Sequence, residues 1–335
     1  MHRALIIGGT GMIGAATARG LLASGWDVTV TGRAAAHLPA DVAEAGGRFV
    51  AADRADPAAL AAALGSGADL LVDCICYTAA DARLLLPLAA HATSTVMVSS
   101  KAVYVDEHGR HSNSDVPACF PDPIPETQPT LAPREDVDFD SREGYGPNKV
   151  AAERVVLDSG LPITVLRPSR VHGVGSTRPR EWVFVKRVLD RRPAVFLAGR
   201  GEGVVHPTAA VNIAALIELV ARRPGGRVLN SADPDAPSAL AIARTVATHL
   251  GHTWAEILLD HDAELGHHPW ESRHPVVLDM TAATELGYVP AGTYARTVAA
   301  ELDWLATGGP PQDTEYFAGL FDYAAEDAYL AAHPG

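Results

Sequence analysis

The chain has 335 residues, 47% of them hydrophobic and 20% charged, and its formal net charge is −13. That length suits one large α/β domain or two lobes. The negative charge argues against a nucleic-acid partner, because binding to a phosphate backbone depends on Lys and Arg.

Neither the apolar runs nor the N-terminus predicts contact with a membrane. No stretch approaches the roughly 18 uninterrupted apolar residues of a membrane span, and the start, MHRALIIGGTGMIG, has no small-residue cleavage site after it. The three cysteines, Cys74, Cys76 and Cys119, are too few for a disulfide framework and fit a reducing compartment. Cys74 and Cys76 share one face of a strand and are expected to be buried apolar residues. We therefore predict a cytoplasmic protein without a signal peptide.

The N-terminal half alternates short β-branched runs with longer Ala-rich stretches of helical pattern. Because the runs are apolar throughout, we expect strands that are buried on both faces, in a parallel sheet covered by helices. The fold class is therefore predicted to be α/β, with a doubly wound parallel sheet. The expected strands are 4–7, 28–31, 48–51, 70–75, 95–99 and 163–167, and the expected helices are 12–24, 57–64, 79–91 and 148–160.

The stretch 106–142 breaks this alternation and is rich in Pro, Asp, Glu and Ser. A long irregular insertion in a compact domain is usually functional, so we expect it to lie over the active site. After Pro168 the pattern is mixed, without an internal repeat. Helices are expected near 181–191, 210–222, 238–250 and 293–306, and short strands near 194–197 and 227–230.

A glycine loop, LIIGGTGMIG, places Gly8, Gly11 and Gly14 directly after the first strand and at the start of a helix. The glycines allow a tight turn and the close approach of a pyrophosphate, which would bind the free N–H groups of the helix N-terminus. An ordinary glycine-rich turn is the alternative. The loop residues expected to contact a dinucleotide also include Thr10, Met12 and Ile13.

The second strand ends in Gly32 and Arg33, and no acidic residue follows until Asp41. NAD-selective proteins usually place a carboxylate here, which would repel a 2′-phosphate. Gly32 leaves room for that phosphate and Arg33 can bind it, so we predict NADP(H) rather than NAD(H). A solvated arginine is the alternative. Asp53 could bind the adenine amino group or, equally well, be a helix N-terminal carboxylate ahead of Pro57.

Tyr145 and Lys149 are four residues apart, so on a helix beginning near Glu143 they share one face. A nearby ammonium stabilises a phenolate, and the pair could then exchange a proton with a carbonyl or alcohol oxygen. A surface helix with a solvated lysine is the alternative. Ser99 and Ser100 end the fifth strand, where a hydroxyl would face the cofactor crevice.

Together, the glycine loop, VMVSSKAVY, YGPNKVAAE and ITVLRPSRVHG resemble the extended or atypical short-chain dehydrogenase/reductase superfamily, of the NAD-dependent epimerase/dehydratase type. The resemblance runs from Gly8 to Leu305. It implies a catalytic set in which Ser100 orients the substrate oxygen, Tyr145 transfers the proton and Lys149 binds the nicotinamide ribose. It also implies a homodimer, a cofactor contact at Pro168 and a small-molecule substrate.

The same resemblance implies a Rossmann domain with a smaller, interleaved C-terminal substrate lobe. We expect residues 1–170 to form the dinucleotide-binding domain, with a further contribution from about 205–232. Residues 171–204 and 233–335 are then expected to form the substrate-binding lobe and the C-terminal tail.

Two departures from the family pattern narrow the expected substrate. Dehydratases of the family carry an acidic pair after the catalytic hydroxyl, where this chain has Lys101 and Ala102, so dehydration is not expected. Epimerases usually bind the sugar-nucleotide diphosphate with an arginine where this chain has Glu202 or Val205, and Arg200 aligns less well. A nucleotide-sugar substrate is therefore in doubt.

Other residues are weaker candidates. The cluster formed by His261, His267, His268 and His274 lacks an ordered spacing on a helix, so no metal site is expected. A role in lining the substrate pocket is more plausible for His268, Trp270 or His274 than metal binding. The residues considered for the substrate pocket are Tyr77, Lys101, His172, Trp182, His206, His268 and Trp270.

The sequence thus predicts an NADP(H)-dependent reductase or alcohol dehydrogenase that acts on a small metabolite. An epimerase that oxidises a sugar or nucleotide-sugar transiently is one alternative. A non-catalytic dinucleotide sensor or RNA-binding relative is an alternative of another class, and both the complete Ser100, Tyr145 and Lys149 set and the negative charge argue against it.

Overall fold

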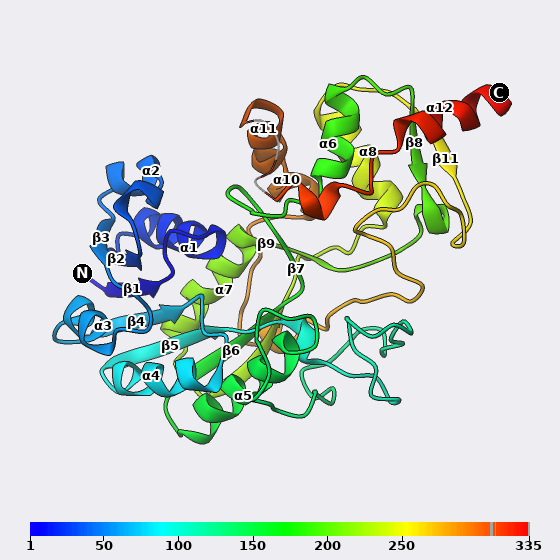
Figure 1. Cartoon of the computed structure of the whole chain (residues 1–335). Helices are drawn as coiled ribbons and strands as arrows, with labels where there is room; N and C mark the ends of the chain where they lie inside the picture. Colours follow the sequence, from blue (N-terminus) through cyan, green and yellow to red (C-terminus); the bar gives the residue numbers. More distant parts are fainter. Residues whose placement is uncertain (309–310, 312, 334–335) are drawn as a thin grey trace.

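The computed structural model describes residues 1–308, 311 and 313–333, and its main feature is a seven-stranded sheet (Figure 1). All neighbouring strands are parallel, in the order β10-β6-β5-β4-β1-β2-β3. The parallel sheet predicted from apolar runs is confirmed. The strands are β1 (Arg3–Ile7), β2 (Asp27–Gly32), β3 (Arg48–Ala51), β4 (Ala68–Asp73), β5 (Ala92–Val98), β6 (Ile163–Pro168) and β10 (Arg227–Ser231).

Helices cover both faces of this sheet, as the doubly wound prediction requires. Alternate residues of β1 divide between the two sides: Ile6 packs under α1 and α7, whereas Leu5 and Ile7 pack under α3, α4 and α5. The covering helices are α1 (Met12–Ala23) and α7 (Ala210–Arg222) on one face, and α3 (Pro57–Leu64), α4 (Ala79–Ala89) and α5 (Tyr145–Asp158) on the other.

The strand order reverses between β1 and β4, because the chain first builds outward to β3 and then returns to the other side. In open α/β sheets, ligands bind at such a switch point, beyond the carboxyl ends of the strands. The loop after β1 carries the glycines, and the segment after β4 carries Tyr77. The topology therefore brings both segments to the edge where a dinucleotide is expected.

A second hydrophobic cluster lies in the C-terminal part of the chain, above the sheet in Figure 1. It is centred on Trp182, Trp270 and Tyr294, which are at most 7% exposed. The predicted helix at 293–306 is two helices in the structure. The elements of this region are α6 (Trp182–Leu189), β8 (Ala194–Leu197), α8 (Ala239–His249), β11 (Ala255–Leu258), α10 (Tyr294–Thr297) and α11 (Ala299–Gly308).

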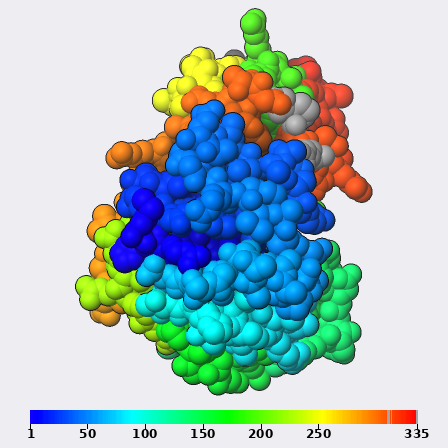
Figure 2. Space-filling view, turned by 90° about the vertical axis from the view of Figure 1, so that its left-hand side faces the viewer, coloured from blue at the N-terminus to red at the C-terminus, as the bar shows by residue number. Residues whose placement is uncertain are grey.

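The division into a dinucleotide domain and a substrate lobe, with boundaries near 170 and 205–232, stays a prediction, and residues 309, 310, 312, 334 and 335 of that lobe lie outside the described ones. Figure 2 views the β3 edge, where the first 60 residues (blue) cover the middle of the face and the C-terminal segments lie above them. Within the described ranges, no helix is long and apolar enough to cross a membrane.

The elements that the sequence did not predict are short. The three-residue strands β7 and β9 pair with each other. Strand β7 follows β6, and strand β9 precedes α7. The tail 316–330, whose sequence YFAGLFDYAAEDAYL predicts an amphipathic aromatic helix, forms a 3₁₀ turn at Glu315–Phe317 and then the helix α12 (Tyr323–Ala332). The additional elements are α2 (Ala40–Glu44), β7 (Arg170–His172), β9 (Pro207–Ala209), α9 (Thr281–Glu285) and β11, which was given above.

The insertion 106–142 contains neither a helix nor a strand, as its composition indicates. It is nevertheless attached at defined points. Ile124 N–H donates to the carbonyl of Val277 and Leu131 N–H to that of Val103, while inside the insertion the Asp106 carboxylate accepts the N–H groups of Arg110 and Cys119. The irregular segment is therefore held against the rest of the molecule without secondary structure of its own.

Candidate active site

The glycine loop has the geometry of an anion-binding turn. Gly8 has a φ of +75°, which favours glycine, and a Cβ at Gly14 would lie 2.5 Å from the Gly8 carbonyl oxygen. Gly11 precedes α1, and no side chain caps the helix or places an acid in its first turn. The N–H groups of the first turn have no partner within a helix. They can therefore receive a pyrophosphate, so the loop fits the dinucleotide predicted from sequence.

The end of β2 lies against this loop. A Cβ at Gly32 would be 3.0 Å from the Thr10 hydroxyl oxygen, so a larger residue would crowd Thr10. Arg33 is exposed and makes no hydrogen bond or ion pair to any described residue. Its guanidinium is therefore available to a ligand.

Asp53 follows β3 and is exposed, and its carboxylate accepts the N–H of Ala55 at 2.8 Å. The N-cap of α3 is instead Asp56, whose carboxylate accepts two backbone N–H groups at 3.0 Å. The alternative reading of Asp53 as the helix N-terminal carboxylate is wrong, since Asp56 has that position. The adenine contact of Asp53 stays a prediction.

Lys149 is buried at the carboxyl ends of β4 and β5. Its Nζ donates hydrogen bonds to the carbonyl oxygens of Cys76 at 2.8 Å and Val98 at 3.0 Å. The same Nζ lies 4.4 Å from the centroid of the Tyr77 ring and 5.9 Å from that of the Tyr145 ring. A lysine that is only 2% exposed is thus held by two carbonyls and two aromatic rings, beside the switch point.

Tyr145 is the first residue of α5 and is half-buried. The helix begins between the two expected starts, near 143 and at 148, so Tyr145 and Lys149 do share a helix. The Tyr77 ring lies 6.5 Å from that of Tyr145 and stacks at 5.4 Å on Phe139 of the insertion. Burial raises the pKa of Tyr77 to about 12, so its phenol is neutral. Tyr145 and Tyr77 therefore face one region from different elements.

The two serines at the end of β5 have different surroundings. The Ser99 hydroxyl is buried and donates to the Glu153 carboxylate, which also pairs with Arg167. The half-buried Ser100 hydroxyl accepts the N–H of Ala102 at 3.1 Å, at the start of a 3₁₀ turn. Ser100 keeps its own proton available for a substrate oxygen, and Ser99 does not. Pro168, the last residue of β6, is buried.

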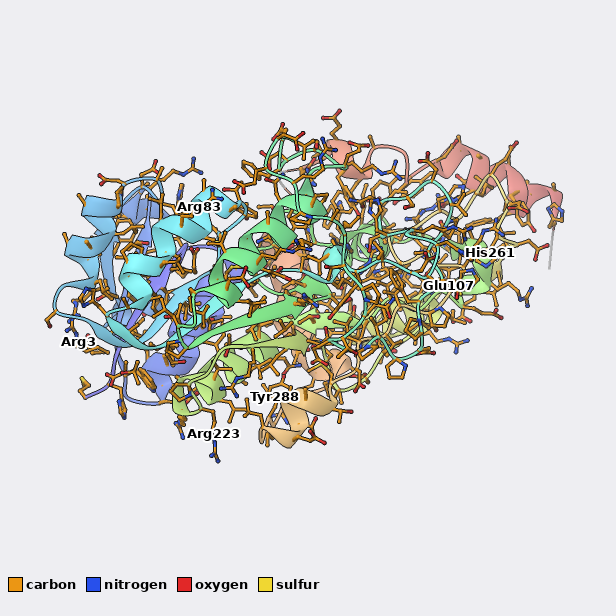
Figure 3. The ribbon with its side chains drawn as sticks, turned by 90° about the horizontal axis from the view of Figure 1, so that it is seen from below. Arg3, Arg83, Glu107, Arg223, His261 and Tyr288 are labelled. Carbon is orange, nitrogen blue, oxygen red and sulfur yellow. The ribbon has the colours of Figure 1, made fainter. Side chains whose placement is uncertain are left out.

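Lys101, the residue after Ser100, lines a cavity of about 330 Å³, whereas Ser100, Tyr145 and Lys149 are not among its lining residues. The insertion forms one wall and the C-terminal region the other; Figure 3 labels Glu107 of the insertion and His261 of the loop after β11 at this end of the molecule. The volume is at the lower end of the range for small-molecule pockets. The lining residues are Lys101, His111, Ser112, Ser114, Pro117, Ala118, Phe120, Arg170, Val205, His261, Glu271, Ser272, Arg273 and Val276.

Two cations of this cavity, Lys101 and Arg170, make no ion pair with any described carboxylate, and Lys101 Nζ contacts only the Ser112 hydroxyl, at 3.2 Å. Burial, together with Arg170 and Arg180, lowers the pKa of Lys101 to about 7. Burial and Arg180 also lower the pKa of Arg170 to about 10. The cavity therefore presents positive charge that the protein itself leaves unpaired.

The other charged groups of the cavity are already paired. The Glu271 carboxylate lies 3.0 Å from His267 Nδ1 and accepts the N–H of His268 at 2.8 Å, and Arg273 pairs with Asp262 at 2.7 Å. They add little to the net charge that a ligand would meet. The acids nearest the cavity thus do not neutralise Lys101.

Of the seven residues considered for the substrate pocket, only Lys101 lines this cavity. Tyr77 lies beside Tyr145 and Lys149 instead. Trp182 and Trp270 are core residues of the C-terminal cluster. A substrate role for any of these residues stays a prediction. His172, His206 and His268 are buried too, with 2%, 4% and 6% exposure.

The sequence missed Arg170, His111 and His261, because residues of the insertion, β7 and the loop after β11 meet only in the folded chain. It also missed a second cluster, formed by His172, Glu181, Asp233 and Glu301. Burial disfavours a charged imidazole, yet contacts with Asp233 and Glu301 outweigh it and raise the pKa of His172 to about 10. Burial and Glu181 raise the pKa of Glu301 to about 7.

The fold and the glycine loop define a class of α/β proteins, those that bind a dinucleotide at the switch point of a parallel sheet. Residues 4–230 match the NAD dependent epimerase/dehydratase family, and the chain belongs to that family. This confirms the resemblance seen in the sequence. None of the curated proteins matches the chain in sequence.

Solved structures of similar fold include two dTDP-glucose 4,6-dehydratases. One, from Bacillus anthracis in complex with NAD, is 16% identical over 91% of this chain and 96% of its own, with a TM-score of 0.67. The other, from Streptomyces venezuelae with NAD bound, is 22% identical over 91% and 97%, with a TM-score of 0.65. A UDP-N-acetylglucosamine 4-epimerase from Methanobrevibacter ruminantium is 16% identical over 92% and 99%, with a TM-score of 0.67. At these identities the likeness establishes the fold.

Proposed function

We propose that the protein is an NADP(H)-dependent oxidoreductase that reduces a carbonyl, or oxidises an alcohol, of a small anionic metabolite. One observation carries the proposal. Tyr145 and Lys149 share α5 at the carboxyl edge of the sheet, and Lys101, the residue after Ser100, lines a cavity whose Lys101 and Arg170 have no ion-pair partner among the described residues. The family supplies the class of chemistry, and this cavity supplies the substrate charge.

In the proposed reaction each side chain has one task. The bound dinucleotide would supply or accept the hydride. The Ser100 hydroxyl donates a hydrogen bond to the substrate oxygen, and the Tyr145 hydroxyl gives that oxygen a proton during reduction or takes one during oxidation. Lys149, held by the Cys76 and Val98 carbonyls, favours the phenolate by its positive charge and would contact the ribose.

The anionic group of the substrate would be a carboxylate or phosphate bound by Lys101 and Arg170. Both groups donate charge-assisted hydrogen bonds, and an arginine can bind such an anion through two nitrogen atoms. In a chain of net charge −13, a cationic cavity would concentrate anions that the rest of the surface repels. We further propose NADP(H), since Arg33 is exposed and without a described partner beside Gly32.

An epimerase that oxidises a sugar or nucleotide-sugar transiently is the second candidate. It is favoured by the family and by similar folds that act on dTDP- and UDP-sugars. Lys101 and Ala102 occupy the expected positions of the dehydratase acids, and Glu202 or Val205 that of the diphosphate arginine. Val205 lines the cavity and Glu202 pairs with Arg200 at 3.8 Å, so neither offers a cation.

The state of the cofactor in purified protein separates the two candidates. A reductase must exchange its dinucleotide at each turnover, whereas an epimerase regenerates it and can retain it. The measurement is the dinucleotide content of denatured protein after extensive gel filtration. We expect less than one dinucleotide per chain and a micromolar dissociation constant for the added cofactor. One tightly held NAD(H) per chain would favour the epimerase. The predicted homodimer would be measured in the same preparation by light scattering.

Substrate charge needs a separate test. With NADPH present, turnover is measured on pairs of carbonyl compounds that differ only in one carboxylate or phosphate. We expect the anionic member to be preferred at least about tenfold, equal to 1.4 kcal/mol. Calorimetry with UDP- and dTDP-hexoses on cofactor-loaded protein should detect weak binding only. Micromolar affinity for either nucleotide-sugar would contradict the proposal and support the epimerase.

A further inference from the structure

A buried cluster outside the candidate active site joins three segments of the chain. His172 ends β7, Glu181 precedes α6, and Glu301 lies in the first turn of α11. Each residue offers one ligand atom, and these three atoms all lie within 4.8 Å of one another. The exposed fractions are 2% for His172, 1% for Glu181 and 0% for Glu301. The cluster is therefore shielded from bulk water.

Asp233 determines which imidazole nitrogen faces the cluster. Its Oδ2 lies 2.9 Å from His172 Nε2, and its Oδ1 accepts the N–H of Ala209 and the side-chain amide of Asn212, at 2.6 and 2.7 Å. A carboxylate that accepts all these bonds keeps a proton on Nε2, so Nδ1 is the nitrogen that gives up its proton when the imidazole binds a metal ion. The other nitrogen, Nδ1, has no hydrogen-bond partner and lies 3.6 Å from Glu301 Oε2.

The two glutamates leave acceptor capacity in the same space. Glu181 Oε1 accepts the Tyr294 hydroxyl at 3.0 Å, but neither carboxylate oxygen of Glu301 has a hydrogen-bond partner. In the described part of the chain, no Lys or Arg forms an ion pair with Glu181, Asp233 or Glu301; His172 alone does so. Buried polar atoms without partners are rare because their desolvation is costly. The protonated His172 is thus the one positive charge paired with these carboxylates in the described chain, and a bound metal ion would displace its Nδ1 proton and take over that role.

We propose that His172 Nδ1 and the carboxylates of Glu181 and Glu301 bind one divalent transition-metal ion such as Zn²⁺ or Mn²⁺. One imidazole and two carboxylates form a ligand set that suits these ions better than it suits Ca²⁺, which prefers oxygen ligands alone. Zinc binds such nitrogen and oxygen atoms at about 2.0–2.2 Å, which places tetrahedral ligand atoms about 3.4 Å apart, so the three atoms, now within 4.8 Å of one another, must approach by up to about 1.4 Å. Asp233 is the outer partner that orients the imidazole, as carboxylates do for metal-bound histidines.

An ion can reach the cluster through a second cavity, of about 310 Å³. His172 and Glu301 line it together with Met12 of α1, and its lining extends to Arg19 and Asp41, which pair at the surface. The bound ion would connect β7, α6 and α11. Its expected effect is therefore on stability and not on the proton transfer at Tyr145.

The experiment uses the full chain purified without chelator or affinity histidines. We expect about one equivalent of metal per chain by mass spectrometry, a reversible fall in Tm on dialysis against EDTA, and recovery with Zn²⁺ or Mn²⁺ followed by calorimetry. His172→Gln and Glu301→Gln should each weaken binding at least about 100-fold, and Asp233→Asn about 10- to 100-fold. The control His267→Gln, at an exposed pair with Glu271, should bind as wild type does.

The measurements on the wild type, its metal content, Tm and heat of binding, test the proposal even if a variant fails to fold. Folded wild-type protein that contains no metal and shows neither heat of binding nor a Tm change would overturn the proposal, and would indicate a network held by a proton on His172. Binding that survives in His172→Gln, Glu181→Gln and Glu301→Gln alike would also overturn it, because the metal would then be elsewhere. Absorption bands of bound Co²⁺ that disappear in Glu301→Gln would support it.

Discussion

The glycine loop and the 330 Å³ cavity, which we propose to bind the cofactor and the substrate respectively, are built differently. The loop is a continuous stretch between β1 and α1, and its chemistry comes from backbone N–H groups that small residues leave accessible. The cavity is assembled from the insertion, β7 and the loops of the C-terminal region, and its chemistry comes from charged side chains. The contrast indicates that a widely shared cofactor is bound by local structure and an individual substrate by contacts distant in sequence.

The largest expected effect concerns the buried ion pairs of the two regions that carry these features, the sheet and the C-terminal region. Arg167→Met removes the partner of Glu153 in the sheet region, where both side chains are nearly fully buried, so we expect a loss of about 3–5 kcal/mol in the free energy of unfolding. Arg187→Met should cost less, because its partner Glu326 keeps Arg192 at 3.3 Å. Urea denaturation measures all variants.

The matched control is Arg83→Met, whose pair with Glu135 is exposed and should contribute under about 1 kcal/mol. Equal losses in the free energy of unfolding for the Arg167 and Arg83 variants would contradict the claim that the buried Arg167–Glu153 pair stabilises the sheet region. A larger loss for Arg187 than for Arg167 would show that the C-terminal region depends on its ion pairs more than the sheet does.

The second prediction tests the cofactor side of the comparison. A hydrogen bond to a charged group contributes about 1.5–3 kcal/mol, so NADP(H) should bind about ten- to a hundredfold more tightly than NAD(H). Arg33→Ala should remove that preference and leave NAD(H) affinity unchanged. Fluorescence titration of both cofactors gives the four dissociation constants. Equal wild-type affinities, or an unchanged ratio in the variant, would show that Arg33 does not bind the 2′-phosphate.

The smallest effect concerns the cavity side and is a pH dependence. Burial, Arg170 and Arg180 lower the pKa of Lys101 to about 7, so the ammonium is present below that pH and is lost as pH rises through it. The affinity for a dicarboxylate such as oxalate should be constant from pH 6 to 7 and then fall by up to about tenfold per unit, the limit for one proton. Lys101→Met should bind weakly at every pH. Affinity in the wild type that does not change up to pH 9 would refute this role.

Much of the fold could be predicted from the sequence because parallel strands buried on both faces are apolar throughout. The six expected strands all lie in the main sheet, and 227–230 adds its edge, β10. The missed elements have few residues: β7 and β9 have three each, and α2 and α9 have five. Such pieces form through tertiary contacts rather than local pattern, so periodicity does not indicate them.

The candidate site divides in the same way. The positions of Gly8, Gly14, Tyr145 and Lys149 follow from local spacing on a loop and a helix, and the structure places them at one edge of the sheet. The charge of the cavity depends on Arg170 approaching Lys101 from a strand about 70 residues further along, which no spacing rule describes. Trp182 and Trp270, which sequence composition suggested for the pocket, are used for packing instead.

The central claim is that Tyr145 transfers the proton in a dinucleotide-dependent reaction, and Tyr145→Phe tests it most directly. General acid–base groups contribute about 10²- to 10⁴-fold, so turnover of an identified substrate should fall by at least about a hundredfold. The cofactor dissociation constant should stay within about twofold of wild type, because the glycine loop and Lys149 remain in place. Turnover that survives within about tenfold, with the cofactor bound normally, would contradict the account.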